Sequence, residues 1–203
     1  MWAGAYPDML QCGNLEGPLA AAESRTHFVR LAFPWKPCAS TVEIEMFAPA
    51  VMQGAWCIVS SPLILGMDMS NASTMADVWP YISNIEAIAV NQAWAGDPGR
   101  LIYPPPSGPD TAGAVPPMEV WAKALPRGAV ALLAINTGPG HAGVLVINLA
   151  DALGKPGWCR AAGSCAVRDI WAQKDGGKLG AGGRWSVKGL APHDSAFVLV
   201  TPA

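Results

Sequence analysis

The chain has 203 residues, of which 51% are hydrophobic and 14% charged, and its net charge is −2. This composition can bury a core and excludes disorder over the whole length. Lysine and arginine form no cluster, which argues against nucleic acid or an anionic membrane as a partner. No apolar run is long enough to span a bilayer, and the N-terminus lacks the pattern of a signal peptide.

The first motif is "AYPDML", residues 5–10. Tyr-Pro-Asp commonly forms a turn, so Asp8 is either a turn residue or part of an active-site loop. The motif by itself leaves both interpretations open.

Residues 54–65 begin with the pattern of a buried helix, which ends at Ser61 and Pro62. The apolar run Leu63–Leu65 then lies between this proline and a glycine. That pattern is typical of an interior strand of a parallel sheet.

Two capping boxes follow this predicted strand. Thr74 with Asp77 predicts the start of a short helix that Pro80 distorts. Ser83 with Glu86 predicts the start of a second, amphipathic helix. A helix, a buried strand and capped helices in this order indicate an α/β fold.

Residues 97–117 are rich in proline and glycine and are predicted to be a linker without regular structure. Six runs of strand length follow, with turn residues between them and no intervening helix. This pattern predicts an antiparallel β-sandwich at 118–203 that folds independently. The runs are "MEVWAKAL", "AVALLAIN", "GVLVINL", "CAVRDIWA", "RWSVKGL" and "SAFVLVT".

Two of the five cysteines, Cys159 and Cys165, lie close together in "GWCRAAGSCAV". A hairpin could bring their Cα atoms within the roughly 7 Å that a disulfide requires. The alternative is a pair of unbonded thiols in a loop. Cys12, Cys38 and Cys57 show no pairing scheme.

The remaining polar side chains do not suggest a metal or cofactor. His27, His141 and His193 have no cysteine or carboxylate at metal-ligand spacing. Glu43 and Glu45 alternate in a charged stretch and are predicted to be solvated. The sequence therefore predicts no metal and no cofactor.

Six segments in this order make the chain similar to glycoside hydrolase family 27, the α-galactosidases and α-N-acetylgalactosaminidases, also called melibiases. The resemblance covers residues 2–28 and 54–203. The segments are "YPDML", "CIVSSPLILGMDM", "ISNIEAIAVNQAWAGDPG", "VWAKALPRGAVALLAIN", "VRDIWAQKD" and "PHDSAFVLV".

The resemblance implies an α/β region followed by an all-β region. Residues 1–96 would be the C-terminal part of a (β/α)8 barrel, 97–117 a linker, and 118–203 an antiparallel β-sandwich. A complete barrel needs about 250 residues, so most of it would lie outside this sequence.

The resemblance also implies a role for Asp8 and Met9, which match residues that line the galactose pocket. The family more often has Asn-Asp before the proline, where this chain has Ala5 and Tyr6. Both catalytic aspartates of the family lie on barrel strands upstream of the matching residues, and Asp68 matches neither of them. A retaining glycosidase needs two carboxyl groups, so the chain alone is expected to be inactive.

Residues 29–53 have no counterpart in the family. The segment could be a true insertion loop or a retained intron, because its ends can be encoded with the boundary letters of an intron. If translated, it is expected to interrupt the helix that leads from Phe28 into Trp56.

Asn71, Ala72 and Ser73 form a sequon for N-glycosylation, which would place the protein on the secretory route. The family resemblance implies a secreted, lysosomal or vacuolar location. It also implies an α-galactoside as the substrate, retention of anomeric configuration, and a homodimer for the full-length enzyme. Acceptance of an N-acetyl group depends on residues upstream.

A second hypothesis is a non-catalytic carbohydrate-binding or interaction module built on the sandwich. Trp121, Trp171 and Trp185 could supply an aromatic face for sugar, although tryptophans at regular strand spacing more often lie in the core. Fold alone does not establish such a function.

Overall fold

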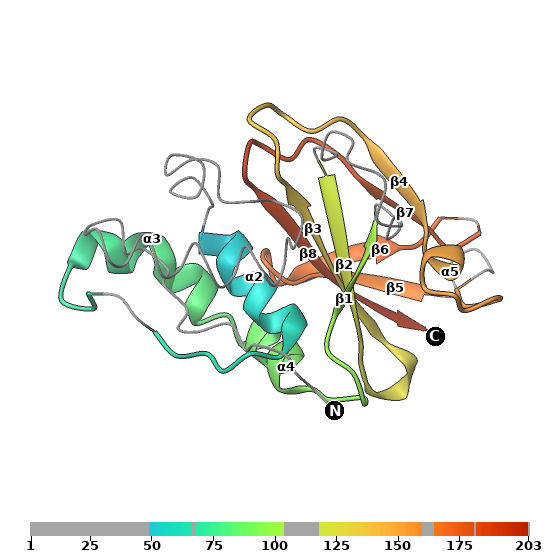
Figure 1. Ribbon diagram of the computed structural model, residues 1–203, viewed down its shortest axis with the longest axis horizontal. Helices are drawn as coiled ribbons and strands as arrows, with labels where there is room; N and C mark the ends of the chain where they lie inside the picture. The colour runs from blue at the N-terminus through green and yellow to red at the C-terminus, as the bar shows by residue number, and fades with distance from the viewer. Residues whose placement is uncertain (1–48, 66–67, 104–117, 160–164, 181, 203) are drawn as a thin grey trace, which may run out of the picture.

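The computed structural model describes residues 49–65, 68–103, 118–159, 165–180 and 182–202. In these residues two antiparallel sheets pack against each other, and helices lie on the outer side of the larger sheet (Figure 1). The fold class predicted for the C-terminal region, an antiparallel β-sandwich, is confirmed.

Among the described residues the larger sheet has six strands and the smaller sheet has two, and every strand pair is antiparallel. All six predicted runs contain a strand. The larger sheet contains, in spatial order, β1 (Arg100–Tyr103), β2 (Met118–Ala124), β3 (Val130–Asn136), β8 (Ser195–Pro202), β5 (Cys165–Asp169) and β6 (Lys174–Lys178). The smaller sheet contains β4 (Leu145–Asn148) and β7 (Arg184–Val187).

The central strand β3 separates two hydrophobic cores. All seven of its residues are buried, and all but the last, Asn136, are apolar. Leu132 packs with Trp185 in the core between the two sheets. Leu133 points the other way, into a core shared with Trp56 and Phe197, because successive side chains of a strand face opposite sides.

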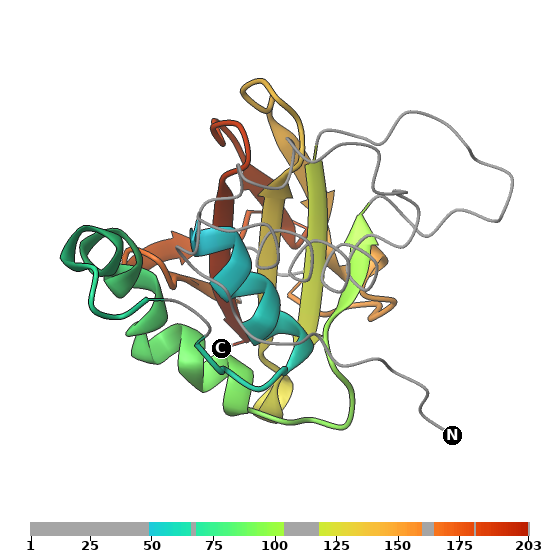
Figure 2. The ribbon, with the colours of Figure 1, turned by 60° about the vertical axis from the view of Figure 1, so that its left-hand side comes forward.

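In the described part of the chain, three helices build the second core against the outer face of the larger sheet. They are α2 (Pro49–Val59), α3 (Ala72–Ile82) and α4 (Ile85–Gln92). Figure 2 shows α2 lying across this face, where it contacts β2, β3 and β8. Two short helical turns, η1 (Pro126–Gly128) and α5 (Leu149–Ala152), connect strands of the sandwich.

Both predicted helix starts are wrong by one to three residues. Asn71 caps α3, since its side-chain oxygen accepts hydrogen bonds from the amides of Ser73 and Thr74. Asn84 caps α4 in the same way. Ser83 instead closes α3, where its hydroxyl donates to the carbonyl of Trp79 at 2.6 Å. Asparagine is as good an N-cap as serine or threonine. The capping-box pattern considers only serine and threonine, so it does not detect Asn71 or Asn84.

Two further predictions differ from the structure. Leu63–Leu65 does not form a strand; only Leu65 has a bridge partner, and Ile64 is 55% exposed. An interior parallel strand would be covered on both faces. The stretch 97–117 does contain a regular element, because β1 pairs with β2 as the edge of the larger sheet.

The end of the 29–53 segment belongs to the fold. Residues 49–53 form the start of α2, and Val51 and Gln53 are almost completely buried. The helix continues through Gly54 without a break. Residues 29–48 lie outside the described part of the chain.

Candidate functional site

The residues matched to the sugar pocket, Asp8 and Met9, lie outside the described residues. The same holds for Glu43, Glu45 and His27. Their roles remain predictions.

Asp68 has a local structural role. Its carboxylate accepts hydrogen bonds from the amide of Ser70 at 2.9 Å and from the hydroxyl of Ser70 at 2.6 Å. These bonds hold the pKa of Asp68 below its ordinary value, because they stabilise the ionised form. The carboxylate is exposed and orders the turn that leads into α3.

The disulfide predicted between Cys159 and Cys165 is confirmed, and their Cα atoms lie 5.4 Å apart. Both residues are buried at the edge of the core between the two sheets. The bond ties the turn after α5 to the start of β5. Cys57 lies elsewhere, in α2, where its sulfur accepts a hydrogen bond from Gln53.

The tryptophans proposed as an aromatic sugar-binding face do not form one. Trp185 is buried in the core between the sheets. Trp121 and Trp171 lie on the opposite side of the larger sheet and pack against the helical core. Trp171 also contacts the rings of Tyr81 and Phe197 at centroid distances of 5.5 and 5.1 Å. This arrangement contradicts the aromatic-face hypothesis.

A buried lysine lies between the sandwich and the helices. Lys123 on β2 is fully buried, and its ammonium donates to backbone carbonyls of Cys57, Val90 and Asn91. These carbonyls belong to the last turns of α2 and α4, where a positive charge complements the helix dipole. Burial lowers the pKa of Lys123 to about 8.

Side chains of α4 supply further links to the sheet. Asn84 donates to the carbonyl of Ile170 at 2.7 Å. Arg168 and Glu86 form a bidentate ion pair, in which Nη2 and Nε of the arginine donate to the carboxylate oxygens at 2.7 and 3.1 Å. This contact raises the pKa of Arg168. The helix is therefore attached to the sandwich at both of its ends.

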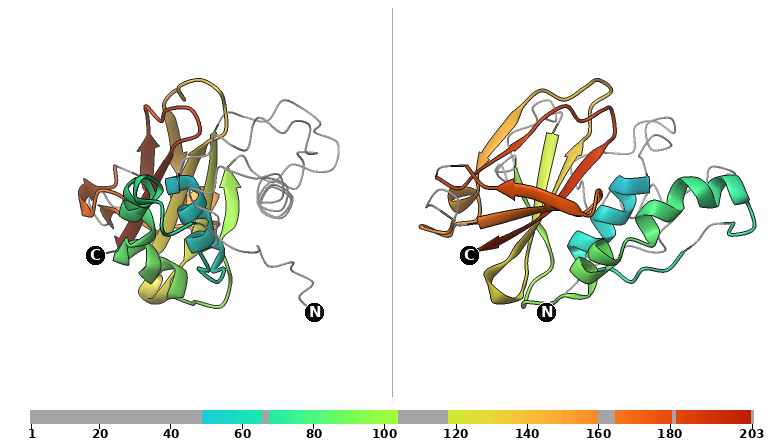
Figure 3. Two further views of the ribbon diagram at one scale, coloured as in Figure 1. Left: turned by 90° about the vertical axis from the view of Figure 1, so that its left-hand side faces the viewer. Right: turned by 180° about the vertical axis from the view of Figure 1, so that it is seen from behind.

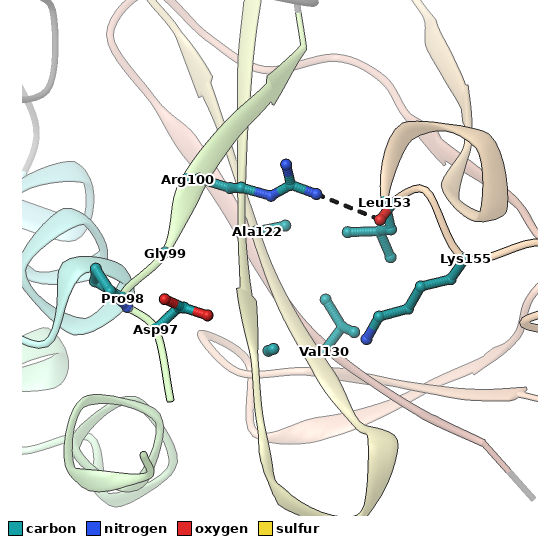
Figure 4. A pocket seen from close by; sticks show the side chains of 9 residues that line it. Asp97, Pro98, Gly99, Arg100, Ala122, Val130, Leu153 and Lys155 are labelled. Carbon is teal, nitrogen blue, oxygen red and sulfur yellow. Dashed lines mark hydrogen bonds between the residues drawn. The ribbon is translucent and has the colours of Figure 1, made fainter. Parts of the chain in front are cut away.

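A groove of about 480 Å³ lies on the face of β2 opposite to Lys123, between the start of β1 and the turn after α5. Figure 4 shows Asp97, Arg100 and Lys155 around its rim and small apolar side chains such as Ala122 beneath. Arg100 donates to the carbonyl of Leu153 at 3.3 Å. Among the described residues that line the groove, Asp97 is the one carboxylate, whereas a retaining glycosidase uses two carboxyl groups.

Of the three histidines, the structure describes His141 and His193. His141 is exposed, and His193 is buried in the turn before β8. Within the described ranges no three His, Cys, Asp or Glu side chains come together as metal ligands. In the same part of the chain, no helix has the length and apolar character needed to cross a bilayer.

Comparison with known families assigns the class of the sandwich. Residues 116–200 match the family described as the alpha galactosidase C-terminal beta sandwich domain. The match covers the sandwich, and the resemblance to the C-terminal part of glycoside hydrolase family 27 is confirmed. The comparison with curated proteins found no match.

Solved structures share this fold over most of the chain. A family 27 β-L-arabinopyranosidase from Geobacillus stearothermophilus superposes with a TM-score of 0.58 at 22% identity, covering 78% of this chain and 32% of its own. Alpha-galactosidase I from Mortierella vinacea superposes with a TM-score of 0.57 at 20% identity, covering 77% of this chain and 36% of its own. The α-galactosidase of Saccharomyces cerevisiae superposes with a TM-score of 0.59 at 16% identity, covering 80% of this chain and 45% of its own. The chain thus spans about a third to under half of these proteins.

Proposed function

We propose that this chain is the C-terminal part of a retaining glycosidase that hydrolyses terminal α-D-galactosyl residues of galactosides and galactolipids. The observation that carries the proposal is the family match at 116–200, on a sandwich whose fold is similar to that of solved α-galactosidases. In this proposal the described residues support the active site and do not contain it. Asp8 and Met9 would be the residues of this chain that contact the sugar.

The chain alone is proposed to be inactive. Cleavage with retention requires one carboxylate as the nucleophile and a second carboxyl group that protonates the leaving oxygen. The matched segments contain neither catalytic aspartate of the family. A single carboxylate at Asp8 cannot supply both functions.

Two glycosidase activities are candidates, and they differ in the sugar that the enzyme releases. One of the similar structures is a β-L-arabinopyranosidase and others are α-galactosidases, so both sugars are tested as substrates below. The disulfide favours an oxidising compartment, which supports a secreted, lysosomal or vacuolar location. A homodimer is proposed for the full-length enzyme.

The test compares two polypeptides on chromogenic α-galactoside, α-N-acetylgalactosaminide and β-L-arabinopyranoside. The purified 203-residue chain is expected to show no turnover above buffer. A polypeptide extended by the in-frame upstream coding sequence, without residues 29–48, is expected to hydrolyse the α-galactoside, and Asp8→Ala should impair it. Turnover by the 203-residue chain, or a folded but inactive extended protein, would contradict the proposal.

A further inference from the structure

Asn71 stands at the tip of the helical region. Figure 1 and Figure 3 show the N-terminal end of α3 extending away from the sandwich. Asn71 is exposed, and so are the flanking residues Met69, Ser70 and Ala72. It is also the only asparagine in the sequence that is followed two residues later by serine or threonine, here Ser73.

The two polar atoms of the Asn71 side chain are used differently. Its oxygen accepts the amides of Ser73 and Thr74, both at 3.1 Å, and so caps α3. Its amide nitrogen makes no hydrogen bond within the described part of the chain. The helix cap therefore leaves that nitrogen available.

We propose that Asn71 carries an N-linked glycan while its side-chain oxygen continues to cap α3. In this modification Nδ2 attacks the anomeric carbon of a polyprenyl-pyrophosphate-linked oligosaccharide. A C–N bond forms, the anomeric C–O bond breaks, the lipid pyrophosphate leaves, and one amide proton passes to a base of the transferase. The product is a secondary amide whose carbonyl oxygen remains a hydrogen-bond acceptor.

The fold can accommodate a glycan at Asn71 but not at the buried asparagines. Asn84 is 1% exposed and Asn136 is 0% exposed, and each of them uses its amide nitrogen to hold a backbone carbonyl. A sugar on either nitrogen would remove such a bond and open the core. Asn71 has neither constraint, because its nitrogen faces no partner and its neighbours are exposed.

The inference rests on the secretory location proposed above, and a second observation supports that location. The Cys159–Cys165 disulfide is the kind of bond that forms in the compartment where N-glycans are added. The glycan and the disulfide lie on different elements, so each can be measured separately.

The test uses the full 203-residue chain behind a secretory leader, translated with microsomes and expressed in a eukaryotic secretory host. Protection from added protease identifies the translocated chains. These are expected to show a mobility shift that a peptide-N-glycosidase removes, leaving Asn71 converted to aspartate in the peptide spectrum. Ser73→Thr should raise the occupied fraction.

Two variants separate the glycan from the cap. Ser73→Ala should abolish the shift and keep the cap, because the amide of residue 73 is still present. Asn71→Asp should also abolish the shift and keep an acceptor at the N-cap. Hydrogen exchange at the Thr74 amide should be equally slow in glycosylated wild type and in Ser73→Ala.

Two results would overturn the proposal. One is a protease-protected chain that carries no glycan at Asn71 in either wild type or Ser73→Thr. The other is a glycosylated chain in which the Thr74 amide exchanges much faster than in Ser73→Ala, because the glycan would then displace the cap. Neither result depends on hydrolase activity, so failure here is distinct from failure of the proposed function.

Discussion

The ammonium group of Lys123 donates a hydrogen bond to the backbone carbonyl of Asn91 across 3.1 Å, which joins β2 to the end of α4. The same nitrogen also reaches the carbonyls of Val90 and, at 3.5 Å, of Cys57. One side chain thus satisfies carbonyls at the ends of two helices that have no partner within their own helix. This contact makes the helices and the sandwich interdependent.

Replacing Lys123 with methionine should destabilise the protein by about 3 kcal/mol. The substitution keeps most of the buried volume but leaves carbonyls of α2 and α4 buried without a donor. The measurement is urea denaturation of the full chain. Lys188→Met, at an exposed position after β7, is the matched control and should change stability by less than about 0.5 kcal/mol. Equal effects of the two substitutions would contradict the role of Lys123.

The stability contribution of Lys123 should also depend on pH. Its pKa is lowered from 10.5 to about 8 in the folded protein, so between these values the unfolded chain binds more protons than the folded one. The free energy of unfolding should therefore rise with pH through this window, by at most about 1.4 kcal/mol per pH unit. The quantity to measure is the difference between wild type and Lys123→Met at pH 7.5 and pH 10. A difference that stays constant would show that Lys123 does not titrate in this range.

Gly54→Ala should destabilise the protein although alanine favours helices. A Cβ atom at Gly54 would lie 2.7 Å from Cδ1 of Leu133 and 3.1 Å from Cζ2 of Trp171. Overpacking of this kind costs about 1–3 kcal/mol, which exceeds the roughly 1 kcal/mol gained in helix propensity. Thermal melts of Gly54→Ala and of Gly143→Ala, where a Cβ would meet nothing within 4 Å, provide the comparison. A stabilised Gly54→Ala would show that α2 is less closely packed on β3.

The structure favours a larger folding unit than the sandwich predicted at 118–203. Without α2, α3 and α4 the outer face of the larger sheet would expose Leu133, Ile135 and Phe197, which are buried together in the described chain. Residues 49–203 should therefore unfold in one cooperative transition, and residues 118–203 should melt broadly and bind a hydrophobic dye. Calorimetry of the two polypeptides checks this. A sharp, two-state melt of 118–203 would show that the sandwich folds without the helices.

The strands of the sandwich and the disulfide could be predicted from the sequence because their signals are local. Alternating or continuous apolar runs between turn residues mark each of the six predicted strands. The six-residue separation of Cys159 and Cys165 suits a short connection between neighbouring elements. The helix starts were missed by a few residues for an equally local reason: asparagine and serine or threonine caps compete within one turn.

Other features depend on contacts between distant segments, and only the tertiary structure decided them. The residues of β6, "KDGGK", are all exposed and have little strand propensity, so pairing with β5 makes them a strand. β1 lies in a stretch rich in proline and glycine and becomes the sheet edge by pairing with β2. The burial of Lys123 requires two helix ends to meet at one point on β2. By itself the sequence determined which residues are apolar and where the chain turns, but a partner far along the chain must be in place before an exposed segment pairs or a charge is buried.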